Sequence, residues 1–209
     1  MNYHEFKKRI QGFPIFSSSQ LAVFPGRLQV LRNQLKEWCQ KGWLVKLKRG
    51  IYVLNRDDRR INPSRVFIAS QLLSPSYIST QYALARYGII PERVADVTSI
   101  TTRKTSVFIN EFGKFVYQHL KSACFAGFVE EKDENGFSYF IAEPEKALVD
   151  FFYLNLSVFP EKDLSIFEDA YRIKREFGFK RKKIVYYAQL FQNKKLLRIA
   201  DNFCQYLRG

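Results

Sequence analysis

The clearest hydrophobic pattern in the chain lies between residues 17 and 54. Its first part has apolar residues at the spacing of one helix face, which no face of a strand would show: Leu28, Leu31, Leu35 and Trp38. Gly42 stands where that helix would end. Ser17 and Gln20 have the spacing of a capping box, which predicts a short preceding helix over 18–24 that ends at Pro25-Gly26.

The opposite face of the longer helix is polar and mostly basic. It carries Gln29, Asn33, Lys36 and Gln40, with Arg32 on its flank, Arg27 at its start and Glu37 as its acid. Arginine suits guanine in the major groove of DNA, and asparagine or glutamine suits adenine. We therefore expect Gln29, Arg32, Asn33 and Lys36 to contact base edges.

A β-hairpin is predicted directly after this helix. Val45 and Leu47 alternate with Lys46 and Lys48, and Arg49-Gly50 is followed by a β-branched and aromatic run. Residues two apart share one face of a strand, so we expect the two lysines on one face and Arg49 at the tip. With Ser18 and Arg27, these three residues are the expected phosphate contacts.

Together these elements predict a winged helix-turn-helix that binds double-stranded DNA. The alternative is that a helix and hairpin of this kind serve as a dimerisation or scaffold module, since fold alone does not fix function.

The rest of the chain predicts a second domain. A charged stretch over 56–61 separates two apolar regions, so the expected division is 1–55 for the winged helix, 56–61 for a linker and 62–209 for the second domain. The fold class is therefore α+β: a winged helix-turn-helix, then a mixed α/β domain with a helical C-terminal tail.

Elements of this second domain follow from caps, turns and periodicity. Helices are expected from Asn62-Pro63 to about residue 73, from Ser79 to a stop at Gly88, and from Pro144. Strands are expected over 94–101, 114–120, 128–131 and 137–141, with a turn at Asn135-Gly136, as a mixed and mostly antiparallel sheet. The helical tail is expected over 164–177, 182–191 and 194–207.

Charge is distributed unevenly along the chain. The net charge of +14 divides into +9 over 1–61, −1 over 62–160 and +6 over 161–209. Two basic ends around a neutral middle indicate a polyanion partner, for which nucleic acid is the first candidate. An anionic membrane is the rival, but no stretch approaches the roughly 18 apolar residues of a membrane span. The chain starts with a polar, amphipathic segment, and the expected location is the cytoplasm.

Two further basic groups are candidates for a second nucleic-acid patch. They are the run Lys180, Arg181, Lys182 and Lys183, and the pair Arg103 and Lys104. The run is equally well explained as a solvated surface, and the pair could instead cap a strand.

The sequence offers no catalytic set. Cys39, Cys124 and Cys204 lack metal-like spacing and are expected to be buried thiols, with only His4 and His119 beside them. A nucleotidyltransferase would need paired carboxylates after a Gly-Ser turn, and neither Gly-Ser nor Asp-x-Asp occurs. Glu143-Pro-Glu145-Lys146 superficially resembles a nuclease motif, but Pro144 makes it a helix start where acids are explained by capping and the dipole. No enzyme activity, metal or cofactor is expected.

Three segments resemble the AbiEi-type antitoxin family. They are the hairpin segment Lys41-Gly-Trp-Leu-Val-Lys-Leu-Lys-Arg-Gly-Ile-Tyr-Val-Leu54, the helix pair around Ile68-Ala69 and Tyr77-Ile-Ser-Thr-Gln-Tyr-Ala-Leu84 with Tyr87-Gly-Ile89, and Glu143-Pro-Glu-Lys-Ala-Leu-Val-Asp150. The resemblance spans about 21–154, and the tail after about residue 156 matches less clearly.

This resemblance implies two roles. The winged helix would repress its own toxin–antitoxin operon at inverted repeats, and the C-terminal domain would counteract a nucleotidyltransferase-like toxin without a stable complex. The alternative is a winged-helix regulator of another operon, whose second domain binds a ligand or forms oligomers.

Overall fold

The N-terminal part is built on two helices and a small sheet. The computed structural model describes residues 2–20, 28–160 and 164–208. Helix α1 (Tyr3–Ile10) begins at a capping box formed by Asn2 and Glu5, and helix α2 spans Leu28–Gln40. Strands β1 (Phe16–Ser17), β3 (Ile51–Leu54) and β2 (Leu44–Lys48) lie side by side in that order. The predicted long helix and hairpin are thus confirmed.

The local signals around α2 are confirmed where the structure describes them. The Ser17 N–H donates to Gln20 Oε1 (2.7 Å) and the Gln20 N–H to Ser17 Oγ (3.3 Å), which is the predicted reciprocal pair. Gly42 adopts a φ of +71° just after α2, as a helix-ending glycine does. Residues 21–24 of the expected short helix, and Arg27, lie outside the described residues.

The hairpin departs from simple alternation. Its register shifts between Lys46, which faces Tyr52, and Lys48, which faces Ile51, so Leu47 is the extra residue of a β-bulge. Leu44 and Leu47 are both buried, the first in the smaller and the second in the larger hydrophobic core. The prediction that Lys46 and Lys48 share one face was wrong, because a bulge cancels the period of two on which it rested.

The second sheet has six strands in the order β6-β7-β5-β4-β9-β8. They are β4 (Ser76–Ile78), β5 (Val97–Thr101), β6 (Ser106–Asn110), β7 (Gly113–His119), β8 (Phe128–Lys132) and β9 (Ser138–Ala142). Pairs β6–β7, β4–β5 and β8–β9 are antiparallel, whereas β5–β7 and β4–β9 are parallel. The mixed sheet is confirmed, but β4 and β6 were not predicted.

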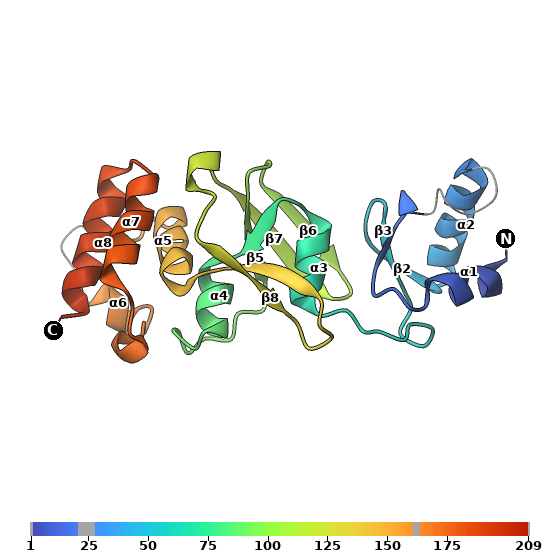
Figure 1. The fold of residues 1–209 in the computed structure, drawn as a ribbon, viewed down its shortest axis with the longest axis horizontal. Coiled ribbons are helices and arrows are strands. Elements are labelled where there is room, and N and C mark those ends of the chain that lie inside the picture. Colours follow the sequence, from blue (N-terminus) through green and yellow to red (C-terminus); the bar gives the residue numbers. More distant parts are fainter. Residues whose placement is uncertain (1, 21–27, 161–163, 209) are drawn as a thin grey trace.

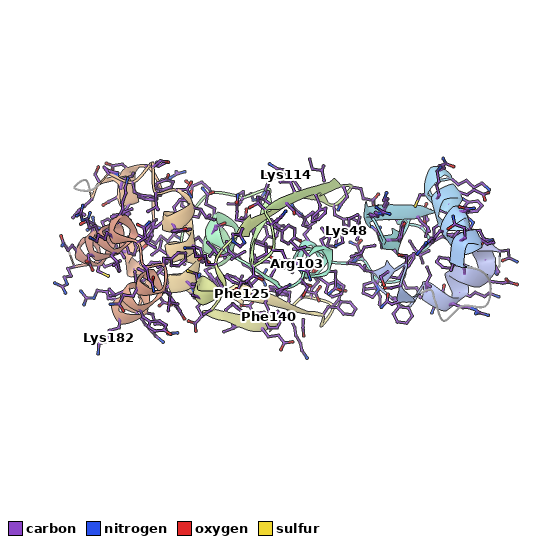
Figure 2. All side chains as sticks on the ribbon, turned by 90° about the horizontal axis from the view of Figure 1, so that it is seen from above. Lys48, Arg103, Lys114, Phe125, Phe140 and Lys182 are labelled. Atoms are coloured by element: carbon purple, nitrogen blue, oxygen red, sulfur yellow. The ribbon has the colours of Figure 1, made fainter. Side chains whose placement is uncertain are left out.

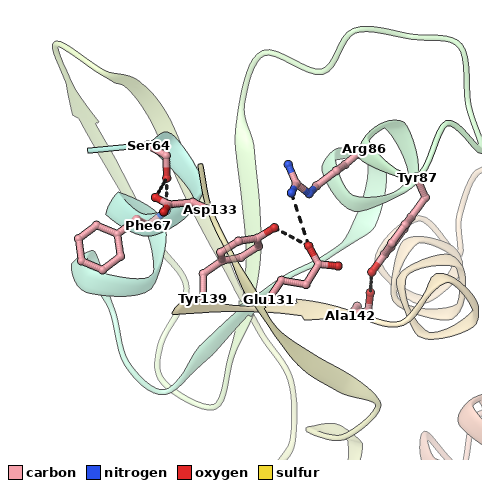
Figure 3. A network of polar contacts seen from close by, with 8 residues as sticks. All are labelled: Ser64, Phe67, Arg86, Tyr87, Glu131, Asp133, Tyr139 and Ala142. Atoms are coloured by element: carbon pink, nitrogen blue, oxygen red, sulfur yellow. Dashed lines mark hydrogen bonds and ion pairs between the residues drawn. The ribbon is translucent and has the colours of Figure 1, made fainter. Parts of the chain in front are cut away.

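Two helices are tied to the β8–β9 hairpin of this sheet by polar contacts (Figure 3). Helix α3 (Arg65–Leu72) is capped by Ser64, whose hydroxyl also donates to Asp133 (2.5 Å), so the predicted cap at Asn62 was two residues early. Helix α4 spans Thr80–Arg86 and is followed by Tyr87, whose hydroxyl donates to the Ala142 carbonyl (2.9 Å). Gly88 comes next, at a φ of +68°. Ser79 precedes α4, but its hydroxyl bonds Asp150 and leaves the helix uncapped by that side chain.

The C-terminal part is helical. It contains the predicted helices α5 (Pro144–Leu154), α7 (Arg181–Leu190) and α8 (Lys194–Tyr206). The predicted helix over 164–177 was wrong: a short α6 (Ile166–Asp169) and a single 3-10 turn η3 (Arg175–Phe177) stand there. Arg172 interrupts the run with a φ of +46°, while its side chain donates to Glu92 (2.5 Å) and the next turn bonds the Ile89 carbonyl.

Figure 1 shows these parts in a row, with α1 and α2 at one end, the six-stranded sheet in the middle and α5 to α8 at the other end. Two groups of buried side chains lie along it. The smaller one contains Phe6, Ile10, Phe16, Leu35, Trp38, Leu44 and Leu54. The larger one belongs to the middle and C-terminal parts, but it also includes Leu47 and Val53 of the β2–β3 hairpin. The hairpin is therefore shared by both cores.

The expected linker is also held in place. Asp58 pairs with Lys7 of α1 and accepts from the Tyr3 hydroxyl (2.5 Å), while Arg59 reaches Glu111 (3.4 Å) between β6 and β7.

Within the part of the chain that the structure describes, no helix has the length and apolar character needed to cross a bilayer.

Candidate nucleic-acid interface

One face of α2 is exposed and polar, as the sequence predicts. Gln29, Arg32, Asn33 and Lys36 are all exposed, while Leu35 and Trp38 on the opposite face are buried. The Gln29 amide donates to Asn33 Oδ1 over 3.4 Å, one helical turn apart. The four side chains are thus presented together and point away from the core.

The acid on this face is already paired. Glu37 accepts from Lys41, one turn further along, at 2.6 Å. Arg32 and Lys36 form no ion pair with any carboxylate in the described residues. Their positive charge is therefore available to an external anion.

A groove runs between α2 and β2. It encloses about 340 Å³ and is lined by Arg32, Lys36, Cys39, Gln40, Lys46 and Tyr52. Three of these six side chains are cations, and none is an acid. Lys46 of the hairpin is thereby brought to the same groove as the two basic residues of the helix.

The hairpin tip is formed by Arg49 and Gly50. Arg49 is exposed, and Gly50 adopts a φ of +83°. The Ser18 N–H donates to the Gly50 carbonyl (2.8 Å), so Ser18 lies against the tip. Lys46 thus faces the groove and Arg49 is at the tip, where Ser18 is hydrogen-bonded to Gly50.

Lys48 lies apart from Lys46, on the side of the hairpin that meets the six-stranded sheet. Its Nζ stands 5.6 Å above the Phe108 ring of β6. Burial lowers the pKa of Lys48 from its ordinary value, and the positive charge of Arg103 lowers it further. The structure therefore brings together two predicted residues, Lys48 and Arg103, that were assigned to separate patches.

The loop that carries Arg103 and Lys104 is exposed at both side chains. The Arg103 N–H donates to Thr101 Oγ1 (3.1 Å), and the Arg103 carbonyl lies 3.0 Å from His119 Nδ1. These contacts use only the backbone of Arg103.

Two acids, Glu143 and Glu145, bind part of the basic run at α7. The sequence predicted both only as acids at the start of their own helix. Lys183 donates to both carboxylate oxygens of Glu143 (2.8 Å each), and the Lys180 N–H donates to Glu145 (2.9 Å). Glu145 thus serves the start of α7, as well as standing in the first turn of its own helix. The partnership joins residues about 40 apart in sequence, which no local spacing indicates.

Arg181 and Lys182 remain on the surface. With Tyr186 and Arg208 they line a groove of about 700 Å³ between α7 and α8, which also holds Asp201. Figure 2 shows Lys182 near one end of the molecule and Lys48 on the other side of the six-stranded sheet. The structure does not join this run to the α2 groove.

Two groove or junction residues were not singled out in the sequence. Tyr52 looked like an ordinary strand residue, and Phe108 belongs to a strand that was not predicted. The β-branched and aromatic run Val107, Phe108 and Ile109 was the signal available for that strand, whose burial pattern alternates between intermediate and exposed.

The cysteines and acids form no candidate metal site among the described residues. Cys124 is buried, with its thiol against the Leu190 carbonyl (3.4 Å), but Cys39 and Cys204 are only partly buried, contrary to the prediction for all three. Burial raises the pKa of the Cys124 thiol.

Lys146, the basic residue of the nuclease-like motif, is buried in the core. Lys146 and Asp150 are fully buried and paired with each other, and Lys146 also donates to the Tyr77 hydroxyl (2.9 Å). Asp150 further accepts from the Ser79 hydroxyl (2.7 Å) and the Tyr77 hydroxyl (3.0 Å). These contacts account for the motif as a buried polar network between α5 and β4.

No protein-family model matches this chain, and a search of curated proteins found no match either.

Proposed function

We propose that the protein is a DNA-binding transcriptional repressor of its own toxin–antitoxin operon, and that it also acts as the antitoxin. The observation that carries the DNA-binding half is the groove between α2 and β2, where three cations gather with no acid among its lining residues. A helix beside a β-hairpin is the arrangement of a winged helix-turn-helix, in which the helix enters the major groove.

In this proposal the two kinds of contact come from different elements. Gln29, Arg32, Asn33 and Lys36 contact base edges, because they are exposed together on α2. Lys46, Lys48 and Arg49 of the hairpin hold phosphates, together with Ser18 and Arg27. The partner is double-stranded operator DNA with inverted repeats.

The antitoxin half rests on the resemblance to the AbiEi-type family. The counterpart would be a nucleotidyltransferase-like toxin, counteracted by the second domain without a stable complex. We propose no catalytic activity and no cofactor for this chain, and the cytoplasm as its location. Burial of Lys146 and Asp150 supports a non-enzymatic second domain, because a fully buried pair cannot reach a substrate.

The two roles can be separated in the full-length protein. We would place the upstream DNA before a reporter gene, and co-express the neighbouring gene as the toxin. The Arg32→Ala, Lys46→Ala double variant should lose repression yet keep its protection against the toxin. Lys8→Ala, which removes an exposed charge from α1, is the matched control and should keep both activities.

Loss of repression alone supports both halves of the proposal. Unchanged repression in the double variant would contradict the DNA-binding surface. Failure of the wild-type protein to protect against the neighbouring gene product would contradict the antitoxin half and favour a regulator of another operon. Full-length variants are preferable to a truncation at Asn62, because Leu47 and Val53 belong to the larger core.

A further inference from the structure

Two edge strands meet where the hairpin adjoins the large sheet. Strand β2 is the edge of the small sheet and β6 is the edge of the six-stranded sheet. The Asn110 side-chain amide donates to the Leu47 carbonyl (3.2 Å), and Lys48 lies over Phe108. These contacts place the end of β2, next to the hairpin tip, against β6.

Lys48 and Arg103 come together at this junction. Figure 2 shows the two labelled residues near each other when the molecule is seen from above, and the positive charge of Arg103 lowers the pKa of Lys48. Neither side chain is in an ion pair with a carboxylate of the described residues. Two like charges held together raise the free energy of the folded protein unless an anion lies between or beside them.

The backbone on each side of this pair is fixed. Thr101 Oγ1 donates to the Pro75 carbonyl (2.7 Å) and accepts from the Arg103 N–H, while His119 holds the Arg103 carbonyl. Lys48 is fixed by strand β2 and by the Phe108 ring beneath it. These contacts hold the backbone at both residues, so the two cationic side chains extend from fixed positions at the same junction.

We propose that Lys48 and Arg103 form a single phosphate-binding site, occupied by a backbone phosphate of the same DNA duplex that the α2 groove binds. The site rests on the proposed DNA-binding function and extends it. DNA would then contact both the hairpin and the six-stranded sheet, and one phosphate would bridge them. A merely structural Lys48, held by its packing on Phe108, is the competing explanation.

The test is a salt titration of DNA binding by the full-length protein. The probes are the duplex from the DNA upstream of the gene and a mixed-sequence duplex of equal length. The variants are Lys48→Gln, Arg103→Gln, the two combined, and Lys194→Gln as a matched exposed lysine of α8, distant from the junction. Thermal unfolding of every variant is followed in parallel.

Each single variant should weaken binding to both duplexes and reduce the slope of log affinity against log salt by about one. The combined variant should also reduce the slope by about one and not two, because a single phosphate is lost. Lys194→Gln should keep the wild-type slope. The unfolding temperature of Arg103→Gln should stay the same or rise, since a repulsion is removed.

Other outcomes overturn the site. Unchanged slopes, a loss of two in the combined variant, or an equal loss with Lys194→Gln would each exclude a shared phosphate. Weaker binding accompanied by a lower unfolding temperature in both single variants would support the structural role of Lys48. Wild-type protein that binds neither duplex would instead contradict the proposed function itself.

Discussion

The basic residues of this protein differ in whether they already form an ion pair with an acid. Lys183 faces Glu143 and Lys41 faces Glu37, whereas Arg32, Lys36 and Lys46 line a groove without an acid. The net charge of +14 therefore does not describe where an anion would bind. Position, and not the total, selects the α2 groove.

Arg32 and Lys46 should have different effects on DNA binding. Arg32→Ala should cost on the order of 1 to 3 kcal/mol and relax base preference at one position, because its guanidinium is expected at a base edge. Lys46→Ala should weaken all sequences alike and reduce the salt slope by about one. Competition gel shifts with single-base variants of the upstream duplex measure both, and identical profiles for the two variants would contradict these roles.

The buried network at Asp150 should matter for stability. Asp150→Asn leaves the Lys146 ammonium buried without its counter-charge, at a cost of about 3 to 5 kcal/mol. Urea unfolding measures this loss. The paired replacement Lys146→Met with Asp150→Leu should recover most of it, since removing both charges avoids the unpaired ion. A loss under about 1 kcal/mol for the single variant would contradict the network's role.

At the residue scale, the exposed face of α2 could be predicted because helical periodicity decides which side chains face outward. The position of Lys48 could not be predicted, because the bulge at Leu47 changes the period locally. Glu143 and Glu145 were likewise assigned from local capping rules, but their partners, Lys183 and the Lys180 backbone, come from a distant helix. Contacts between remote segments leave no local spacing to find.

Among the elements, the β2–β3 hairpin depends on Gly50. Its φ of +83° is costly for a residue with a Cβ, and a Cβ would lie 3.2 Å from Ser18 Oγ. Gly50→Ala should therefore lower the free energy of unfolding by more than the roughly 1 to 2 kcal/mol of the backbone strain alone.

Gly136 supplies the matched control for this prediction. It has a φ of +82° with nothing within 4 Å of its added Cβ, so Gly136→Ala isolates the strain. Urea unfolding should show the larger loss at Gly50, and Ser18→Ala in the Gly50→Ala background should remove the excess. An equal loss at both glycines would show that the approach to Ser18 has no cost.

The attachment of α7 to α5 should depend on pH. Hydrogen bonds from Lys183 and Tyr187 hold the pKa of Glu143 below its ordinary value of 4.5. A carboxyl group whose folded pKa is lowered stabilises the protein above its unfolded pKa, and that contribution is lost as the pH falls through the folded value.

Thermal unfolding of the wild type and Glu143→Gln tests this dependence. The wild type should be more stable at about pH 7, and the difference should shrink toward about pH 3. Glu130→Gln, at an exposed carboxylate on β8, should show no such change. A difference that stays constant across this range would contradict the charge-dependent contact.

At the element scale, strong local signals predicted α2, α5, α7, α8 and the β2–β3 hairpin. The failures occurred where tertiary contacts outweigh propensity. The segment 164–177 has helix-forming residues, but Arg172 takes a φ of +46° while it bonds Glu92. Strand β6 was also missed, and all five of its residues pair with β7.

At the scale of the whole molecule, the hairpin connects two parts that the sequence suggested were separated by a linker. Leu44 and Leu54 belong to the smaller core, while Leu47 and Val53 belong to the larger one. The composition predicted two basic ends, but it could not predict that the hairpin lies against β6. Val45 and Leu47 face the larger core, and the bulge turns Lys48 toward the same side.

The proposal that matters most for this arrangement is that the α2 groove binds operator DNA. The most direct measurement is nuclease protection of the upstream DNA by the full-length wild type and by the Arg32→Ala, Lys46→Ala double variant. We expect protected half-sites about one helical turn apart with the wild type, and none with a folded double variant. Absence of protection by the wild type at low salt, or unchanged protection by the double variant, would contradict it.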